Sequence, residues 1–360
     1  MNKKLKIYVY AICKNEEEFV KRWVDSMSEA DGIYVLDTGS TDNTVEKLKE
    51  KGVNVETKII SPWRFDVARN ESLKLIPEDA DICVCTDLDE VFVPGWRKIL
   101  EESWVDDATK ARYTYNWSLD DQNKPIVSFF YEKTHTLKDY KWTHPVHEVL
   151  TFIGEKEKIL TIPDITLNHY PDRNKSRSSY LPLLELSVEE DPDDDRNMHY
   201  LGREYMYYGR WNECIDTLIK HLKLPKATWK DERSASMRFI ARSYTALKRY
   251  DEAIMWLDKA IEEAPYLRDP LIDKAILMYT LENWDELEKL VLKALEIPIN
   301  GKTYINEVFT FNETPYDLLS LAYYNKKDKE NALENVSKAI EINPNDERLR
   351  KNYEYILKMK

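Results

Sequence analysis

The chain has 360 residues, of which 42% are hydrophobic, and a formal net charge of −13. This length suits two domains, and the apolar fraction is sufficient for packed cores. A strongly acidic chain disfavours non-specific binding to nucleic acid, because phosphate contacts require Lys and Arg. No apolar run approaches the length of a transmembrane helix, and the charged start lacks a signal-peptide cleavage site. We therefore expect a soluble, cytoplasmic protein.

The first 90 residues alternate between short apolar strands and helical segments. Asn15 and Glu18 form the pattern of a capping box before the first helix, and Gly52 is placed to end the second helix. The expected strands are residues 5–13, 33–36, 53–60 and 81–86, and the second and third helices are residues 42–51 and 66–75. This order predicts a parallel sheet covered on both faces.

Residues 109–170 have a less regular pattern. Segments 112–119, 126–134 and 149–153 resemble strands, and no long helix separates them. They predict mixed or antiparallel strands beside the main sheet. The four cysteines of the chain lie inside expected strands or a helix, which favours buried free thiols.

From about residue 180 the chain is expected to be wholly helical, and it repeats. Four units centre on Cys214, Ala253, Leu287 and Ala332, each with an aromatic residue or a Glu-Asn pair near the start of its second helix. The third unit is degenerate, and the longer spacing before the fourth predicts an insertion at residues 298–312. The pattern resembles tetratricopeptide repeats, whose unit is about 34 residues and which form concave surfaces that bind proteins or peptides.

Three carboxylates follow the apolar run of residues 82–85, namely Asp87, Asp89 and Glu90. The run has the character of a buried parallel strand, and ligands of open α/β sheets bind beyond the carboxyl ends of such strands. Asp87 and Asp89 are two residues apart and share a face on extended backbone. Two close carboxylates suit a hard divalent cation, which in turn binds a diphosphate.

The ends of the first two strands carry further candidate ligands. Asp37 stands at the carboxyl end of the second strand, where its carboxylate can accept hydrogen bonds from a base or ribose. Gly39 permits a tight turn after it, and Thr41 is placed to cap the next helix. Lys14 and Glu16 follow the first strand at the same edge, so we assign them to the same nucleotide-binding site.

Four ordered motifs resemble the glycosyltransferases of family 2, which have the GT-A fold: residues 12–16, 35–44, 66–70 and 86–90. Residues 142–186 also resemble the small cytoplasmic branch of that family that carries tetratricopeptide repeats. The resemblance implies an α/β GT-A domain at residues 1–180, with a mostly parallel central sheet flanked by helices. An all-α tetratricopeptide-repeat domain of about four repeats would follow at residues 181–360.

The resemblance also implies transfer of a sugar from a nucleotide diphosphate donor, preferably a UDP-sugar, with inversion at the anomeric carbon. Asp37 would contact the base or ribose, and Arg69 the diphosphate or base. Asp87 and Asp89 would hold Mn²⁺ or Mg²⁺ and the donor. The usual Asp-Asp-Gly-Ser is Asp37-Thr38-Gly39-Ser40 here, so any role of a second acid is absent.

The acceptor must lose a proton, so a general base is required near the anomeric carbon. Our candidate is Glu148, with Asp120, Asp121 and Glu90 as alternatives. The alternative interpretation of Glu148 is a structural ion pair.

A late histidine completes the metal shell in many metal-using enzymes of this fold, and His169 is the candidate, with His147 as the alternative. Arg173, Lys175 and Arg177 form a basic cluster that either clamps the diphosphate or belongs to a solvated linker.

The acceptor is expected to be a peptide, a protein or a saccharide, and the repeats to recognise it or to form a homo-oligomer. The alternative function is a catalytically weak or inactive repeat scaffold for protein–protein interaction. The net charge makes a nucleic-acid acceptor an unfavoured third possibility.

Overall fold

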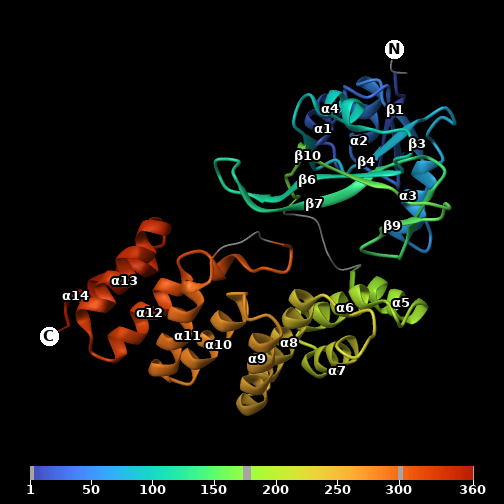
Figure 1. Cartoon of the computed structure of the whole chain (residues 1–360). Helices are drawn as coiled ribbons and strands as arrows, with labels where there is room; N and C mark the ends of the chain where they lie inside the picture. Colours follow the sequence, from blue (N-terminus) through green and yellow to red (C-terminus); the bar gives the residue numbers. More distant parts are fainter. Residues whose placement is uncertain (1–3, 173–179, 299–302, 360) are drawn as a thin grey trace. The chain divides into compact units, whose positions relative to one another are not determined.

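The computed structural model describes residues 4–172, 180–298 and 303–359 (Figure 1). It divides into two compact units, Met1–Ser187 and Val188–Lys360. Helix α5 (Tyr180–Glu190) spans this division, and the boundary expected from sequence, after residue 180, lies at the start of that helix.

An eight-stranded sheet is the centre of the first unit, in the order β3-β2-β1-β4-β7-β6-β10-β5. The four strands at one side are parallel to one another, as predicted. Among them, β1 lies between β2 and β4. They are β1 (Ile7–Cys13), β2 (Gly32–Asp37), β3 (Asn54–Thr57) and β4 (Ile82–Cys85). Their carboxyl ends therefore lie at one edge.

The other half of the sheet is mixed. β7 (Pro125–His135) is antiparallel to β4 and to β6 (Lys110–Leu119), while β10 (Ile159–His169) is parallel to β6 and antiparallel to β5 (Glu90–Phe92). The prediction of mixed strands here is confirmed for two segments. It is wrong for residues 149–153, because β9 (Val149–Phe152) pairs with β8 (Tyr140–Thr143) in a separate two-stranded ribbon.

Both faces of the sheet are covered. The odd-numbered residues of β1 pack with α1 (Val20–Met27), α2 (Thr44–Glu50) and α4 (Trp96–Ser103) in one core. On the opposite face, Tyr10 and Ile12 pack with α3 (Phe65–Leu73) and the β8–β9 ribbon. The alternation of strand side chains thus assigns each face its own cover.

The first loop differs from the prediction. Asn15 does not cap α1, which begins five residues later. Its backbone is left-handed (φ 55°), and its side-chain oxygen accepts a hydrogen bond from the Thr41 backbone N–H at 2.6 Å. Thr41 does not cap α2 either; Asp42 accepts from the Thr44 N–H at 3.0 Å. Asn15 thereby joins the loops after β1 and β2. The predicted role of Gly52 is confirmed, since it follows α2 with φ 78°.

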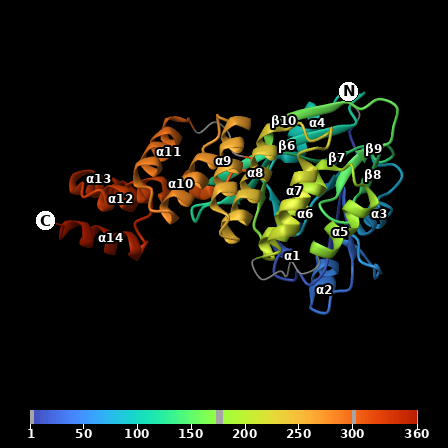
Figure 2. The ribbon, with the colours of Figure 1, turned by 90° about the horizontal axis from the view of Figure 1, so that it is seen from below.

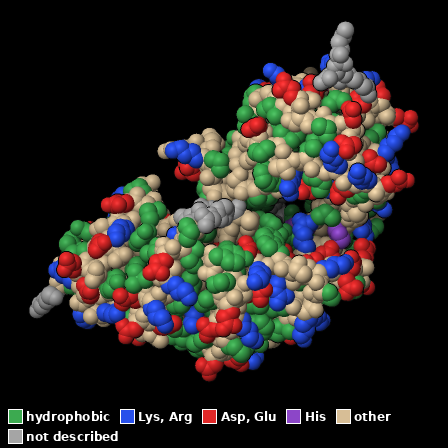
Figure 3. All heavy atoms as spheres, viewed as in Figure 1, with side chains coloured by type: hydrophobic (Ala, Val, Ile, Leu, Met, Phe, Trp, Pro, Cys, Tyr) green, Lys and Arg blue, Asp and Glu red, His purple; other side chains and the backbone are tan. Residues whose placement is uncertain are grey.

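The second unit consists of antiparallel helix pairs that follow one another along the chain (Figures 1 and 2). The pairs and a last helix are α6 (Asp195–Tyr207) with α7 (Trp211–His221), α8 (Lys230–Ala246) with α9 (Tyr250–Glu263), α10 (Asp269–Thr280) with α11 (Trp284–Glu296), α12 (Thr314–Asn325) with α13 (Lys329–Ile342), and α14 (Glu347–Leu357). The first helices of neighbouring pairs contact one another and form an inner row. Acidic and basic side chains are mixed over the face of these helices seen in Figure 3.

Each helix pair is joined at a left-handed residue. These residues are Gly209, Lys248, Glu282 and Lys327, with φ of 71°, 59°, 56° and 66°. Five positions after each of them stands the buried residue on which the sequence repeat is centred, Cys214, Ala253, Leu287 or Ala332. The repeated sequence pattern therefore corresponds to one repeated backbone geometry.

The described part of the predicted insertion after the gap, residues 303–312, contains a short 3₁₀ helix (Val308–Thr310) and lies on the inner row of helices. The Glu307 backbone N–H donates to Asp269 of α10 at 2.8 Å. Its carboxylate accepts from Arg242 of α8 at 2.7 Å and from Arg238 at 3.3 Å. Part of the inner surface of the repeats is thus occupied by the chain itself.

Candidate active site

The acidic motif forms a closed turn after β4. The Asp87 N–H donates to a carboxylate oxygen of Glu90 at 2.8 Å, and the Glu90 N–H donates to the Asp87 carbonyl at 3.0 Å. Just before the turn, the buried Thr86 hydroxyl accepts from the Trp23 indole N–H of α1 at 3.0 Å. These bonds fix the direction in which the Asp87 and Asp89 side chains leave the strand end.

The Asp87 carboxylate forms ion pairs with two basic side chains, Arg69 and Lys133. One carboxylate oxygen accepts from Arg69 Nη2 at 2.7 Å and the other from Lys133 Nζ at 2.9 Å. Burial alone would raise the pKa of Asp87, but the two cations outweigh it and lower that pKa. Asp87 is therefore a stable carboxylate in this arrangement.

Arg69 connects Asp87 to Glu148. Its side chain is 4% exposed, and its Nε donates to a Glu148 oxygen at 2.6 Å. Burial disfavours the charged guanidinium, but Asp87 and Glu148 outweigh burial and raise the pKa of Arg69. The planar fork of arginine suits such a bridge between two carboxylates.

The β8–β9 ribbon brings Glu148 to this place. The Asn70 side chain, next to Arg69 on α3, exchanges two hydrogen bonds with the Trp142 backbone, at 2.8 and 3.0 Å. The Phe65 N–H donates to the Pro145 carbonyl at 2.9 Å. The sequence motifs at residues 66–70 and 142–148 are expected to belong to one site, and the structure brings them together.

Lys133 was not identified from sequence. It lies on β7 with 4% of its surface exposed, above the Tyr131 ring and 3.7 Å from Glu90. Burial lowers the pKa of Lys133, but Asp87 and Glu90 outweigh it and raise that pKa. Burial raises the pKa of Glu90, which also accepts from the Tyr115 hydroxyl at 2.9 Å. The sequence signal that could have identified Lys133 is its place among the inward-facing aromatic residues of its strand.

Asp89 lies beside His169, the last residue of β10, with 3.4 Å between Oδ2 and Nε2. His169 Nδ1 is 3.0 Å from the Trp117 carbonyl, which can only accept, so Nδ1 carries a proton. Nε2 therefore faces Asp89 either with a second proton or with a lone pair available to a cation. Burial lowers the pKa of His169, but Asp89 outweighs it and raises that pKa.

The donor set of Asp89 and His169 fits a divalent cation. A carboxylate oxygen and an imidazole nitrogen 3.4 Å apart resemble neighbouring ligands of an octahedral ion, which lie about 3 Å apart. Over residues 4–172, 180–298 and 303–359, no three His, Cys, Asp or Glu side chains surround one such position. Asp87 faces Arg69 and Lys133 here, so its predicted metal role depends on a rearrangement of those two cations.

The predicted nucleotide ligands lie at the carboxyl edge of β1 and β2. Asp37 is 1% exposed, and its carboxylate accepts from the backbone N–H groups of Gly39 and Ser40 at 3.2 and 3.0 Å. Lys14 is exposed and Glu16 is buried. Asp37 thus shapes its own loop, and contacts of these three residues with a nucleotide stay a prediction.

The remaining candidates lie in other surroundings. Asp120 accepts from the backbone of Gln122 and Lys124 in the β6–β7 turn, which also contains the exposed Asp121. The centroid of the His147 ring lies 5.7 Å from the centroid of the Tyr180 ring. The predicted basic cluster of Arg173, Lys175 and Arg177 lies outside the described residues.

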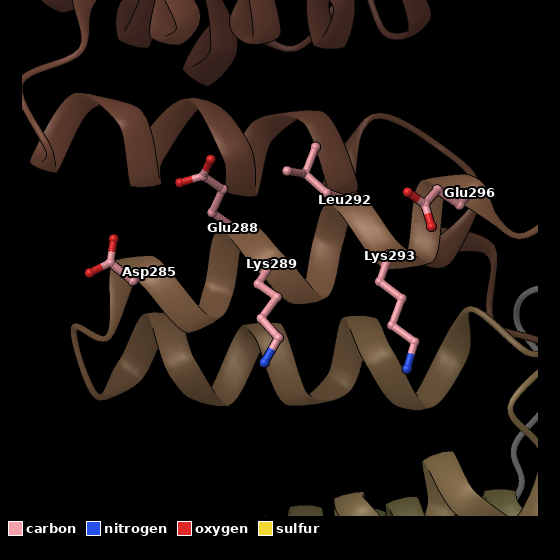
Figure 4. A pocket seen from close by; sticks show the side chains of 6 residues that line it. All are labelled: Asp285, Glu288, Lys289, Leu292, Lys293 and Glu296. Carbon is pink, nitrogen blue, oxygen red and sulfur yellow. The ribbon is translucent and has the colours of Figure 1, made fainter.

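A shallow pocket on α11 has a different character (Figure 4). Charged side chains dominate its lining, and Lys326, which directly follows α12, forms ion pairs with two of them, Asp285 and Glu288, both at 2.6 Å. These charges are satisfied by neighbouring helices, which is typical of a solvated helix surface.

Comparisons with known proteins agree with this division of the chain. Residues 8–154 match the family described as Glycosyl transferase family 2, and residues 239–266 and 314–346 match the tetratricopeptide repeat. The first match includes Asp37, Arg69, Asp87 and Glu148, and it ends before His169. A comparison with curated proteins finds no match.

Three solved structures resemble about half of the chain. TTC0263, a thermophilic TPR protein in Thermus thermophilus, has 20% identity, a TM-score of 0.38 and coverage of 50% of this chain and 90% of its own. YrrB, a TPR protein with an unusual peptide-binding site, has 16% identity, a TM-score of 0.38 and coverages of 49% and 83%. MamA has 19% identity, a TM-score of 0.38 and coverages of 50% and 99%. The family matches alone assign residues 8–154 to a domain of glycosyl transferase family 2, which tetratricopeptide repeats follow in the same chain.

Proposed function

We propose that the chain is a metal-dependent, inverting glycosyltransferase. It moves a sugar from a nucleotide diphosphate donor, preferably a UDP-sugar, to a peptide, protein or saccharide acceptor. The observation that carries the proposal is the convergence of Asp87, Asp89, Arg69, Glu148 and His169 beyond the carboxyl end of β4. Acids, cations and a histidine drawn from separate segments meet where α/β sheets bind ligands.

Each of these residues has a task that its surroundings support. Asp89 and His169 would hold Mn²⁺ or Mg²⁺, which neutralises charge on the departing diphosphate. Arg69 and Lys133 are two buried cations at the same place, and they attract the diphosphate oxygens. The loops of Lys14, Glu16 and Asp37 would bind the nucleoside.

Glu148 is the proposed general base. The acceptor hydroxyl, thiol or amide loses its proton to the Glu148 carboxylate as it attacks the anomeric carbon. The bond from that carbon to the diphosphate oxygen breaks, and its electron pair leaves with the nucleotide. One displacement from the opposite face inverts the anomeric centre.

The test is a thermal-shift screen of nucleotide sugars with MnCl₂ or with EDTA. A ligand at about 100 times its Kd stabilises the native state by about 2.7 kcal/mol and raises Tm by several degrees. Wild type and the exposed-site control Asp164→Asn should respond only with Mn²⁺, and Asp89→Asn should not respond. A metal response in Asp89→Asn equal to that of wild type would remove Asp89 from the metal site.

The scaffold alternative is supported by the repeats alone. A glycosyltransferase of this kind is expected to hydrolyse its donor slowly when no acceptor is present. If no nucleotide sugar raises the Tm of the wild-type protein and none is hydrolysed, the scaffold is the better assignment.

A further inference from the structure

Trp117 is a large apolar side chain exposed beside the candidate metal ligands. It lies on β6 and is 46% exposed. Its indole stacks on the His169 ring, with 4.8 Å between the ring centroids and an angle of 24° between the planes. His169 in turn is 3.4 Å from Asp89. Only the His169 ring therefore lies between the exposed indole and the site assigned to the diphosphate.

The position of Trp117 is fixed by the sheet. Asn116 and Asn168 are opposite each other in the parallel pair β6–β10, and their side-chain amides form a hydrogen bond of 2.7 Å. The following residues, Trp117 and His169, are therefore neighbours on one face of the sheet. The bond from His169 Nδ1 to the Trp117 carbonyl adds a second tie at 3.0 Å.

Buried aromatic rings support the indole from below. Tyr115 lies two positions earlier on the same face, is 3% exposed and stacks on Tyr131 at 4.6 Å. Its ring is 6.2 Å from that of Trp117. A wall of aromatic rings thus runs from the core to the rim of the site and ends in a half-exposed indole, which is rigid because its neighbours are packed.

We propose that Trp117 is a stacking platform for a pyranose ring, a suggestion that rests on the function proposed above. The axial C–H face of a pyranose is apolar, and an indole offers it a flat, rigid surface while the hydroxyl groups remain in water. A donor sugar is bonded directly to the diphosphate and so lies next to the Asp89–His169 pair. A saccharide acceptor, which approaches the anomeric carbon from the other side, also has a pyranose ring that can stack on the indole.

The experiment compares Trp117→Ala and Trp117→Phe with wild type by titration calorimetry, using UDP, UDP-glucose and UDP-N-acetylglucosamine with MnCl₂. Phe130→Ala is the matched control, because Phe130 is 48% exposed on the neighbouring strand β7. If the platform holds the donor sugar, Trp117→Ala should weaken a UDP-sugar by about 2- to 10-fold and leave UDP unchanged. Trp117→Phe should keep most of the affinity.

If the platform holds an acceptor sugar, UDP and UDP-sugar affinities stay unchanged in Trp117→Ala. Transfer to a panel of nitrophenyl glycosides then falls through a higher KM for the glycoside, while donor hydrolysis is kept. Equal weakening of UDP and UDP-sugar would overturn the proposal, because Trp117 would then act only by positioning His169. Unchanged affinities together with unchanged transfer would also overturn it.

Failure of the function itself has another signature. If wild type binds none of the three nucleotides and hydrolyses no donor from a wider nucleotide-sugar panel, the donor site is absent. The proposed stacking role of Trp117 is then contradicted together with the proposed function. Far-UV circular dichroism of each variant establishes that the comparison is made on folded protein.

Discussion

At the scale of single residues, the candidate site depends on the pairing of buried charges. Asp87 forms ion pairs with Arg69 from α3 and with Lys133 from β7. Arg69 also binds Glu148, and Lys133 also lies near Glu90. Removal of one partner leaves charge that is poorly solvated, and such a loss costs far more than the net stabilisation of the pair.

We predict that Lys133→Met lowers the free energy of unfolding by about 3–5 kcal/mol, because Asp87 and Glu90 then lie close together with one cation fewer. The control Lys58→Met removes an exposed lysine that binds Glu71 at 2.6 Å, and it should cost less than about 1 kcal/mol. Urea unfolding followed by circular dichroism gives both values. Equal losses would contradict the assigned role of Lys133.

Glu148→Gln should preserve nucleotide affinity and reduce transfer by about 10²- to 10⁴-fold. Glutamine keeps an oxygen that can accept from Arg69 Nε, but it cannot take the acceptor proton. The measurement is kcat for transfer beside the Kd for nucleotide. Transfer at the wild-type rate would assign the base to another carboxylate, and Glu90 would be examined next.

Much of the site was predictable from residues at strand ends, but not all of it. The acids of residues 87–89 follow an apolar run, and that local pattern predicts their place at the edge. Lys133 and Trp117 lie within strands and not beyond a strand end, and alternation shows which residues share a face but not which strand lies alongside. The neighbours of β6 and β7 are decided by long-range pairing.

At the scale of elements, the strand that carries Lys133 ends in a buried histidine. His135 Nε2 lies 2.7 Å from the Tyr10 hydroxyl, and its Nδ1 lies 2.8 Å from the Thr136 carbonyl. Because that carbonyl can only accept, Nδ1 carries a proton. Burial lowers the pKa of His135 to about 4. This low pKa leaves Nε2 unprotonated at neutral pH, so that Nε2 accepts from the Tyr10 hydroxyl.

This pKa makes the stability of the first unit depend on pH. The unfolded chain protonates His135 below about pH 6.5, while the folded chain does not until about pH 4. The contribution is therefore present above pH 6.5 and is lost as the pH falls toward 4, by about 2–3 kcal/mol at pH 4.5. In urea unfolding at pH 7 and 4.5, His135→Gln should lose less stability than wild type. An equal loss would contradict the neutral buried ring.

The turns between paired helices offer a second test of an element. Lys248 and Lys327 adopt left-handed backbone, which costs a residue with a Cβ about 1–2 kcal/mol, whereas glycine at Gly209 avoids this cost. Lys248→Gly and Lys327→Gly should each stabilise by about 0.5–1 kcal/mol after the greater freedom of glycine in the unfolded chain is subtracted. Gly209→Ala should destabilise. Thermal unfolding measures all three, and opposite signs would contradict the assigned geometry.

Among the elements, local patterns predicted β1 to β4, β6, β7, α1 to α3 and the helix pairs. They did not predict β5, β8, α4 or β10, and they placed residues 149–153 in the wrong sheet. Short strands such as β5 (Glu90–Phe92) have too few residues for an alternation to be visible. The separate β8–β9 ribbon is explained by its packing on α3, a contact that no local pattern contains.

At the scale of the whole molecule, each unit has hydrophobic cores of its own. Within the described residues, no helix combines the length and apolar character needed to cross a membrane. The change from alternating strands and helices to a helical repeat predicted this two-part organisation, because the two periods reflect different ways of burying apolar surface.

Deletion of residues 195–360 should leave the metal-dependent response to nucleotide in place and reduce transfer to acceptor. All the residues assigned to the donor, the metal and the base lie before residue 170, so the donor site needs none of the deleted helices. Thermal shift with UDP and MnCl₂ tests the first part, and transfer beside donor hydrolysis tests the second. Loss of donor hydrolysis by a folded truncated protein would contradict it.

The segment on the inner row of repeat helices has a consequence for any partner. The segment that carries Glu307 belongs to the same chain as α8 and α10, which Glu307 contacts, so its local concentration at those helices is of the order of millimolar. If the segment binds these helices with micromolar intrinsic affinity, a free peptide that competes for Arg238, Arg242 and Asp269 would bind about 10³-fold more weakly to the intact chain. A ligand that also engages helices beyond this segment would gain contacts that the internal competitor does not block, so we expect any peptide partner of the repeats to be long.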